Sequence, residues 1–270
     1  MKRIELNNLS IEINNKKILN SINMKINEGE TILIVGPNGH GKSTLFKSIL
    51  KHYSTKISSG NLVINNELAN EWTTDKIAKS GIFLANQYPI EIPGLKTFDL
   101  LRNELSHDGK EIKVLDFYKQ VTHKLKELGL NDEFLKRNIN ENFSGGERKK
   151  MEILQMLLLN PDFIFLDEID SGLDSDALQK ITKILLEQKQ KNKAIIYISH
   201  NDKLLQDLIP DRVYLIVNGS IILEGDKELA NRINNEGYEW IEKELNISIK
   251  KESEDINLLN TAKDFYCNGK

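Results

Sequence analysis

The sequence has one cysteine and no apolar segment of membrane-spanning length. With the single thiol of Cys267 the chain can form no internal disulfide, which favours a reducing compartment. A membrane-spanning helix needs about 18 to 20 mostly apolar residues, and no run approaches that length. The start of the chain also lacks the apolar core of a secretory signal. We therefore expect no direct membrane insertion and a cytoplasmic location, or an organelle stroma if a targeting segment was removed.

A basic excess, metal-ligand spacing and long heptad arrays are also missing. The 270 residues carry 37 Lys and Arg against 40 Asp and Glu, a formal net charge of −3. Nucleic-acid-binding domains usually carry an excess of basic residues, so we expect no nucleic-acid partner. No Cys and His spacing typical of iron–sulfur cluster ligands occurs. A chain of this length can nevertheless bury a sizeable core without disulfides or metals.

Short apolar runs predict strands, and apolar residues at helical spacing predict helices. Strands are predicted over residues 4–9, 11–13, 21–26, 31–35, 61–65, 163–166, 194–199, 213–217 and 221–224, with a further apolar burst over 81–85. Helices are predicted over residues 43–51, 177–190, 203–208 and around 238–245, and helical periodicity runs from 98 to about 137. Asn218 and Gly219 form a favourable hairpin turn between the last two strands.

This order of elements is typical of an α/β fold with a parallel core, an antiparallel β lobe on the N-terminal side and a mostly helical insert. We expect one domain over residues 1–245, with a helical subdomain at about 88–143. A polar tail is expected over residues 246–270.

The segment Gly36-Pro37-Asn38-Gly39-His40-Gly41-Lys42-Ser43 matches the pattern G-x-x-x-x-G-K-[ST]. It follows a predicted strand and opens a predicted helix, which is the context of a phosphate-binding loop. The glycines let successive N–H groups face the phosphates, and the helix N-terminus adds partial positive charge. Lys42 would reach the β- and γ-phosphates, Ser43 would ligate Mg²⁺, and Thr44 completes the predicted nucleotide site. His40 would contribute its backbone N–H to the nucleotide site. Its side chain could approach the γ-phosphate or a neighbouring subunit, but we expect it to be tolerated there and to point away.

Two carboxylates, Asp167 and Glu168, follow the apolar strand predicted over residues 163–166. Asp167 would help to hold Mg²⁺. Successive side chains of a strand point in opposite directions, so Glu168 is expected to point away from the metal. There it would act as a general base or position the attacking water.

A second anion site is predicted where Ser144, Gly145, Gly146 and Glu147 precede a helix expected to begin at Arg148. Serine and glycines at a helix N-terminus favour anion binding. Because one chain needs one phosphate cradle, a second cradle indicates a composite site shared between two copies.

The order of these motifs resembles that of ATP-binding-cassette ATPases over about residues 2–240. The resemblance also takes in Gln87, the segment Ser171-Gly172-Leu173-Asp174 and the pair Ser199-His200. It implies ATP as the nucleotide and places Asp174 at a dimer seam. The implied catalytic residues are Glu168, His200 and Gln87, the implied metal ligands are Ser43, Gln87 and Asp167, and Ser144, Gly145 and Gly146 would meet the nucleotide of the opposite copy.

The resemblance is sharper to the SufC family, the ATPases of the SUF iron–sulfur cluster assembly machinery. Four segments carry it: FLANQYPIEIPG at 83–94, FSGGERKK at 143–150, DEIDSGLD at 167–174 and EGYEW at 236–240. Ile169 departs from the serine usual in that family. The resemblance implies SufB/SufD-like scaffold partners and two ATPase copies that ATP clamps together. We expect the scaffold to contact the region from Gln87 to Leu101 and not the tail.

Many cassette ATPases stack adenine on an aromatic residue after the first strands, but the turn here is Asn14-Asn15-Lys16-Lys17. Stacking of a base on an aromatic ring is worth about 1–3 kcal/mol in nucleic-acid complexes. Weak base selectivity is therefore expected, with Ile18 or a lysine stem as a partial substitute.

Three other functions would use similar motifs. The nucleotide-binding subunit of a membrane transporter would use the same chemistry with a different partner. A chromosome-maintenance ATPase would need a long coiled coil between Lys42 and Asp167, and only about 125 residues without heptads lie there. A non-catalytic binding module is disfavoured by Glu168 and His200.

Overall fold

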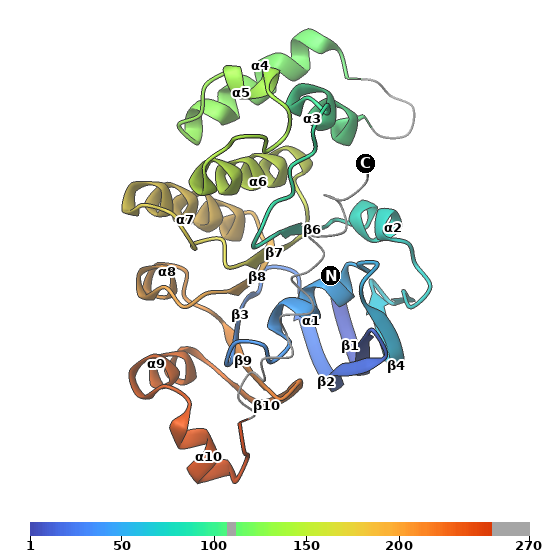
Figure 1. Ribbon diagram of the computed structural model, residues 1–270, viewed down its shortest axis with the longest axis vertical. Coiled ribbons are helices and arrows are strands. Elements are labelled where there is room, and N and C mark those ends of the chain that lie inside the picture. Colours follow the sequence, from blue (N-terminus) through green and yellow to red (C-terminus); the bar gives the residue numbers. More distant parts are fainter. Residues whose placement is uncertain (107–111, 250–270) are drawn as a thin grey trace, which may run out of the picture.

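The computed structural model describes residues 1–106 and 112–249, so most of the predicted tail, with Cys267, lies outside the described residues. Two sheets form the framework (Figure 1). The smaller sheet is antiparallel and contains β2 (Lys16–Asn27), β1 (Arg3–Ile13), β4 (Lys56–Ile64) and β5 (Glu67–Leu68), in that order. The larger contains β10 (Ser220–Gly225), β9 (Arg212–Val217), β3 (Thr31–Val35), β8 (Ala194–Ile198), β7 (Phe163–Asp167) and β6 (Ile82–Ala85).

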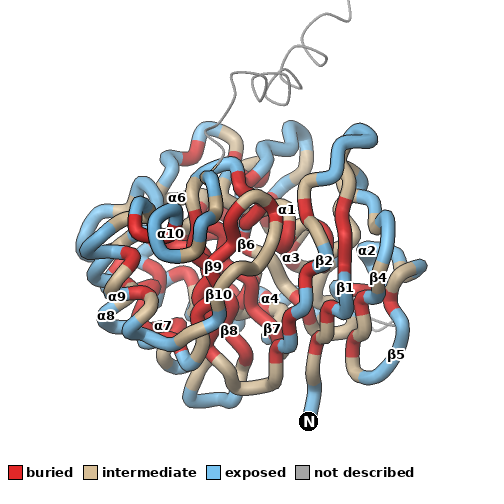
Figure 2. The backbone as a smooth tube through the Cα atoms, turned by 90° about the horizontal axis from the view of Figure 1, so that it is seen from below, coloured by how far each residue is buried: buried red, intermediate tan, exposed pale blue. Residues whose placement is uncertain are grey.

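Five strands of the larger sheet, β9 through β6, are parallel, and β10 is the antiparallel edge strand. Side chains of β3 alternate between two cores. Ile32 and Ile34 pack in the core shared with the antiparallel sheet, whereas Leu33 and Val35 pack in the core shared with most of the helices. Both faces of the larger sheet are therefore covered, as is usual for parallel sheets, and Figure 2 shows its strands as largely buried segments.

The helices divide between the two faces of the larger sheet (Figure 1). On the face toward the antiparallel sheet, the core includes residues of α1 (Lys42–Ile49) and α2 (Thr74–Lys79). The other core includes residues of α3 (Thr97–Leu105), α4 (Val114–Glu127), α5 (Glu133–Lys136), α6 (Gly145–Leu159), α7 (Ser175–Gln190), α8 (Asp202–Asp207), α9 (Lys227–Glu236) and α10 (Glu239–Leu245). Within the described ranges, no helix is both long and apolar enough to cross a membrane.

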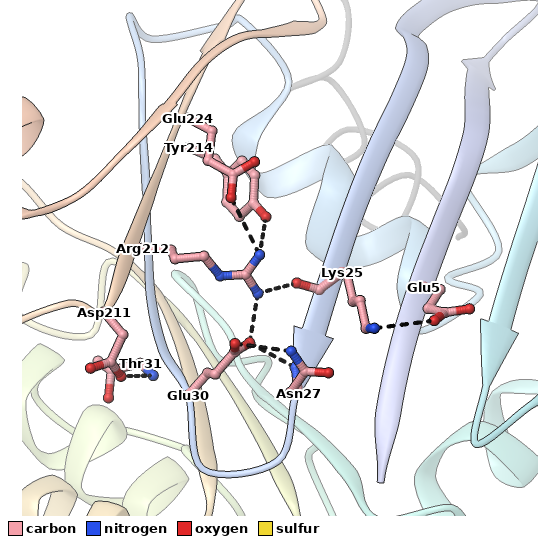
Figure 3. Close-up of polar contacts among 9 residues, drawn as sticks. All are labelled: Glu5, Lys25, Asn27, Glu30, Thr31, Asp211, Arg212, Tyr214 and Glu224. Atoms are coloured by element: carbon pink, nitrogen blue, oxygen red, sulfur yellow. Dashed lines mark hydrogen bonds and ion pairs between the residues drawn. The ribbon is translucent and has the colours of Figure 1, made fainter. Parts of the chain in front are cut away.

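Arg212, at the start of β9, ties the two sheets together (Figure 3). Its guanidinium donates to the Glu30 carboxylate at 2.6 Å and to the carbonyl oxygen of Lys25 at the end of β2. It also donates to the Tyr214 hydroxyl at 2.6 Å. Glu30 in turn accepts from the backbone N–H of Asn27 at 2.8 Å. Charge-assisted hydrogen bonds of this kind are stronger than neutral ones. They hold the end of β2, in the antiparallel sheet, against the start of β9 in the larger sheet.

The predicted fold class is confirmed, with a parallel core, an antiparallel lobe and a helical region. The hairpin turn is also confirmed, because Asn218 and Gly219 both adopt positive φ between β9 and β10. Residues 4–9 and 11–13 form a single strand, β1, whose register shifts at irregularities rather than ending in a turn. The helix expected from Arg148 begins at Gly145, because Ser144 and Glu147 form a reciprocal cap at its N-terminus.

Candidate nucleotide-binding site

The carboxyl ends of the parallel strands bring most of the predicted site residues to one edge of the sheet. The phosphate loop follows β3, Gln87 follows β6, Asp167 ends β7, and His200 follows β8. The strands β3, β8 and β7 end at the same level of the sheet, since Ile198 of β8 pairs with Asp167 on one side and with Ile34 on the other. Ligands of open α/β sheets bind at this edge.

The phosphate loop closes around the ammonium group of Lys42. Its Nζ donates to the carbonyl oxygens of Gly36 at 2.6 Å and Pro37 at 3.0 Å. Gly36 has a φ of 148°, and a Cβ there would lie 2.1 Å from the Ile216 carbonyl oxygen, so only glycine fits. Beyond it, Asn38 and Gly39 form the exposed tip of the loop, Gly41 is the residue before α1, and Ser43 and Thr44 lie in its first turn.

Ser43 and Asp167 form a pair of oxygen groups beside the loop. The Ser43 Oγ donates to Asp167 Oδ1 at 3.0 Å. Asp167 is only 3% exposed, and burial raises the pKa of its carboxyl group, with the neighbouring charge of Glu168 adding to the rise. Hard oxygen donors and a buried negative charge suit a divalent cation such as Mg²⁺, so these residues fit the predicted metal role.

Glu168 does not continue strand β7, which ends at Asp167. Its φ of 49° is left-handed, a conformation that is costly for a non-glycine residue and recurs at functional sites. The expectation that it points away from Asp167 by strand alternation therefore rested on the wrong geometry. Its carboxylate accepts a hydrogen bond from Gln87 Nε2 at 2.5 Å, which joins the segment after β6 to the segment after β7.

His200 and Asp170 lie near this pair. Partial burial lowers the pKa of His200, and the Lys42 ammonium lowers it further, while the carboxylates of Glu168 and Asp170 oppose the shift. Burial raises the pKa of Asp170, although a hydrogen bond from Ser199 lowers it. Among the described residues, the buried Oδ1 atom of Asp170 has no hydrogen-bond partner. Sequence reasoning did not single out Asp170; its position two residues after Glu168 was the available signal.

The side chain of His40 is buried and hydrogen-bonded, so it has a structural role that the sequence did not predict. The residue is 8% exposed, and its Nδ1 accepts a hydrogen bond from the backbone N–H of Asn218 at 2.9 Å. An acceptor Nδ1 leaves the ring proton on Nε2. The side chain thus connects the phosphate loop to the turn between β9 and β10.

Ser144, Gly145 and Gly146 lie away from the phosphate loop of their own chain. They begin α6, which packs on the face of the large sheet opposite to α1 (Figure 1). Within the described residues, the hydrogen bonds of Ser144 are to Glu147 and Arg148 of its own helix. One copy of the chain therefore does not bring the two predicted anion sites together.

Two buried ionisable residues of α6, Lys149 and Glu152, bind the backbone of Asn86, the residue before Gln87. Lys149 Nζ donates to the Asn86 carbonyl oxygen at 3.0 Å, and the Asn86 N–H donates to Glu152 at 3.0 Å. Burial raises the pKa of Glu152 to about 7 and lowers that of Lys149. Sequence reasoning missed this role, because a run of basic residues normally indicates a solvated helix face.

Comparison with known proteins decides the family. The family model described as ABC transporter matches residues 19–171. A probable ABC transporter ATP-binding protein of Streptococcus pyogenes is 41% identical over 94% of this chain and all of its own length. The chain belongs to the ABC transporter ATP-binding family. As a member of this family it is an ATP-binding, ATP-hydrolysing enzyme.

Other similar proteins agree on the cassette. A probable ATP-dependent transporter, ycf16, of Cyanophora paradoxa is 41% identical over 89% of this chain and 95% of its own length. Vegetative protein 296 of Bacillus subtilis is 38% identical over 90% of this chain and 95% of its own length. Among solved structures, a dimeric bacterial ABC transporter cassette superposes with a TM-score of 0.72 at 24% identity, over 83% of this chain and 98% of that one, which supports the fold.

Proposed function

We propose that this cassette hydrolyses ATP to drive conformational change in a SufB/SufD-like scaffold during iron–sulfur cluster assembly in the cytoplasm. The observation that carries the proposal is the segment after Gln87. Its sequence resembles that of the SufC family, and its side chains Tyr88 and Ile90 are 81% and 76% exposed. Gln87 itself bonds Glu168, so this exposed segment adjoins the hydrolytic residues.

The backbone of this segment is fixed even though Tyr88, Ile90 and Ile92 are exposed. Asn140 Nδ2 donates to the Ile90 carbonyl oxygen at 2.9 Å, and the Ile92 N–H donates to the Ile139 carbonyl oxygen at 3.3 Å. Glu91 pairs with Arg148 on α6. A docking surface that is already ordered loses little conformational entropy on binding. Apolar and aromatic anchors on such a surface suit a protein partner.

The chemistry follows from the residues around the loop. The backbone N–H groups of residues 38–43 and the Lys42 ammonium would bind the ATP phosphates. Ser43, Gln87 and Asp167 would hold Mg²⁺, which neutralises phosphate charge when bound. Glu168 would accept the proton of the attacking water through its carboxylate. His200, whose lowered pKa favours the neutral ring, would donate its ring N–H to the γ-phosphate.

Hydrolysis would require two copies of the cassette. The Ser144 cradle lies across the sheet from the phosphate loop of its own chain, so it would complete the site of the opposite copy, with Asp174 at the seam. A solved cassette with the same fold is described as dimeric, which supports this arrangement. We assign the cassette to residues 1–245 with its helical subdomain at about 88–143.

A membrane transporter is the second candidate, because several similar proteins are named as ABC transporter ATP-binding proteins. The two functions differ in the partner that the cassette binds. Affinity purification of the tagged full chain from its own cells, with mass spectrometry of bound proteins, separates them. We expect SufB/SufD-like scaffold proteins. Recovery of polytopic membrane proteins without scaffold proteins would instead support the transporter function and reject ours.

A further inference from the structure

The C-terminal part of the chain contacts the first residue of the phosphate loop. Tyr238, between α9 and α10, accepts a hydrogen bond at its hydroxyl from the Gly36 N–H at 3.2 Å. The two residues are 202 positions apart in the sequence. The ring of Tyr238 is half-buried and packs against the helical core, next to the buried Trp240 and Ile241 of α10. The hydroxyl is therefore held in place by packing that is independent of the loop.

Gly36 needs a partner of this kind. It is buried and lies just beyond Val35, the last residue of β3. The carbonyl oxygen of Ile216 approaches so closely that no side chain fits at this position. A buried backbone N–H without a partner is costly, and the Tyr238 hydroxyl supplies the acceptor. The carbonyl oxygen of the same glycine accepts a hydrogen bond from Lys42 Nζ at 2.6 Å, so both backbone polar groups of Gly36 are used at the start of the loop.

The middle of the loop is connected to the C-terminal segment by a second route. His40 accepts from the Asn218 N–H at 2.9 Å, and the Asn218 side-chain amide donates to the Ser248 carbonyl oxygen at 2.8 Å. Beside Ser248, Ile247 and Ile249 pack against the helical core. The packed part of the chain thus extends to Ile249. It contacts the loop directly at Gly36, through Tyr238, and indirectly at His40, through the β9–β10 turn at Asn218.

We propose that Tyr238 is a positioning residue of the nucleotide site, which fixes the Gly36 peptide and thereby the loop that encloses Lys42. Tyr238 acts through Gly36. The proposal rests on the assignment of residues 36–43 as the ATP-phosphate loop. Loss of the hydroxyl should loosen the start of the loop, so that more ordering must occur when nucleotide binds, and affinity falls.

The test compares Tyr238→Phe with Tyr197→Phe in the full chain. Tyr197 of β8 is a matched control, because its buried hydroxyl donates to the Leu208 carbonyl oxygen at 2.7 Å, after α8 and not in the phosphate loop. One hydrogen bond corresponds to an effect of about three- to tenfold. We expect Tyr238→Phe to raise the Kd for ADP by calorimetry, and the KM for ATP, by about that factor with little change in kcat. Tyr197→Phe should change thermal stability alone.

Hydrogen exchange gives a second measurement. The backbone amides of Gly36 and of residues 38–40 should exchange faster in Tyr238→Phe than in the parent, while those of β7 keep their parental rates. Parental Kd and KM in a folded Tyr238→Phe variant would overturn the inference, as would a variant that fails to fold, which makes the hydroxyl a stability residue. Failure of the parent chain itself to bind ADP would overturn the loop assignment instead.

Discussion

Ser43 and Asp167 stand 124 positions apart in the sequence, yet the hydroxyl of one donates to the carboxylate of the other at 3.0 Å. They meet because β3 and β7 flank β8 in the parallel sheet and end at the same edge. The pair that we assign to Mg²⁺ is thus assembled by the fold itself. Burial of the charged carboxylate lowers the stability of the fold, since desolvation raises the pKa of Asp167.

This loss of stability predicts that Asp167→Asn has a pH-dependent effect on the free energy of unfolding of the protein without nucleotide. The pKa of Asp167 is higher in the folded than in the unfolded chain, so its destabilising charge is absent in acid and grows as pH rises through the folded pKa. We expect Asp167→Asn to raise the free energy of unfolding by on the order of 1 kcal/mol at pH 7.5 and to leave it unchanged at pH 4. Urea unfolding at both pH values measures this.

Asp176→Asn, in the exposed first turn of α7, is the control for Asp167→Asn. The same Asp167 variant should lose Mg²⁺-dependent ATP hydrolysis, whereas Asp176→Asn should keep it. A gain in stability that is equal at both pH values would show that the charge of Asp167 is not its source.

Lys42→Ala should abolish binding of ATP and ADP. The ammonium is already held inside the loop by the carbonyl oxygens of Gly36 and Pro37, and its removal takes away the point charge on the β- and γ-phosphates. We expect a loss of at least about 100-fold in affinity, on the scale of a charge-assisted contact of 3 kcal/mol. Calorimetry with Lys183→Ala, an exposed lysine of α7, as the control checks this. Parental affinity in Lys42→Ala would reject the loop assignment.

The sequence predicted the phosphate loop and the acidic strand end because each depends on local chemistry. Glycines before Lys42 and an apolar strand before Asp167 have few other uses at that spacing. The environment of His40 could not be predicted, because Asn218, its partner, lies 178 positions away. Lys149 was also unpredictable, since its burial depends on the packing of α6 against the segment after β6.

Short and polar elements escaped prediction for a different reason. Helix α2 has a single buried residue, Ile77, and α9 has two, Ala230 and Ile233, so each offers few apolar positions to the sequence pattern. Both begin after a capping side chain, Thr73 and Asp226 respectively. Those caps were the available signal, and a cap alone does not distinguish a helix from a turn.

Glu168→Gln should keep ATP binding and lose hydrolysis. The amide oxygen can still accept the hydrogen bond from Gln87, but the group cannot take a proton from water. Loss of a general base typically costs about 10²- to 10⁴-fold in rate, measured as released phosphate. ATP should then trap paired copies, visible by light scattering. Glu187→Gln, exposed on α7, should behave as the parent, and parental turnover in Glu168→Gln would exclude this residue as the base.

The double substitution Tyr88→Ala and Ile90→Ala should weaken binding to the scaffold while sparing the ATPase. Both side chains are exposed, so their removal takes away little internal packing and the melting temperature should stay within a few degrees. The backbone that carries them is held by Asn140 and Ile139, so Gln87 should keep its place. Exposed anchors at a partner interface typically contribute about 1–2 kcal/mol or more each, which predicts at least a tenfold rise in the Kd for the scaffold.

The matched control replaces two exposed apolar side chains elsewhere, Tyr53 and Leu115, with alanine. Calorimetry with purified scaffold measures partner binding, and the same titration with ADP measures the nucleotide site. We expect only the Tyr88 and Ile90 pair to affect the scaffold, and neither pair to affect ADP. Equal loss of scaffold binding in both double variants would mean that the contact depends on general surface apolarity. If the Tyr88 and Ile90 pair has no effect while deletion of residues 250–270 abolishes binding, the scaffold docks on the tail instead.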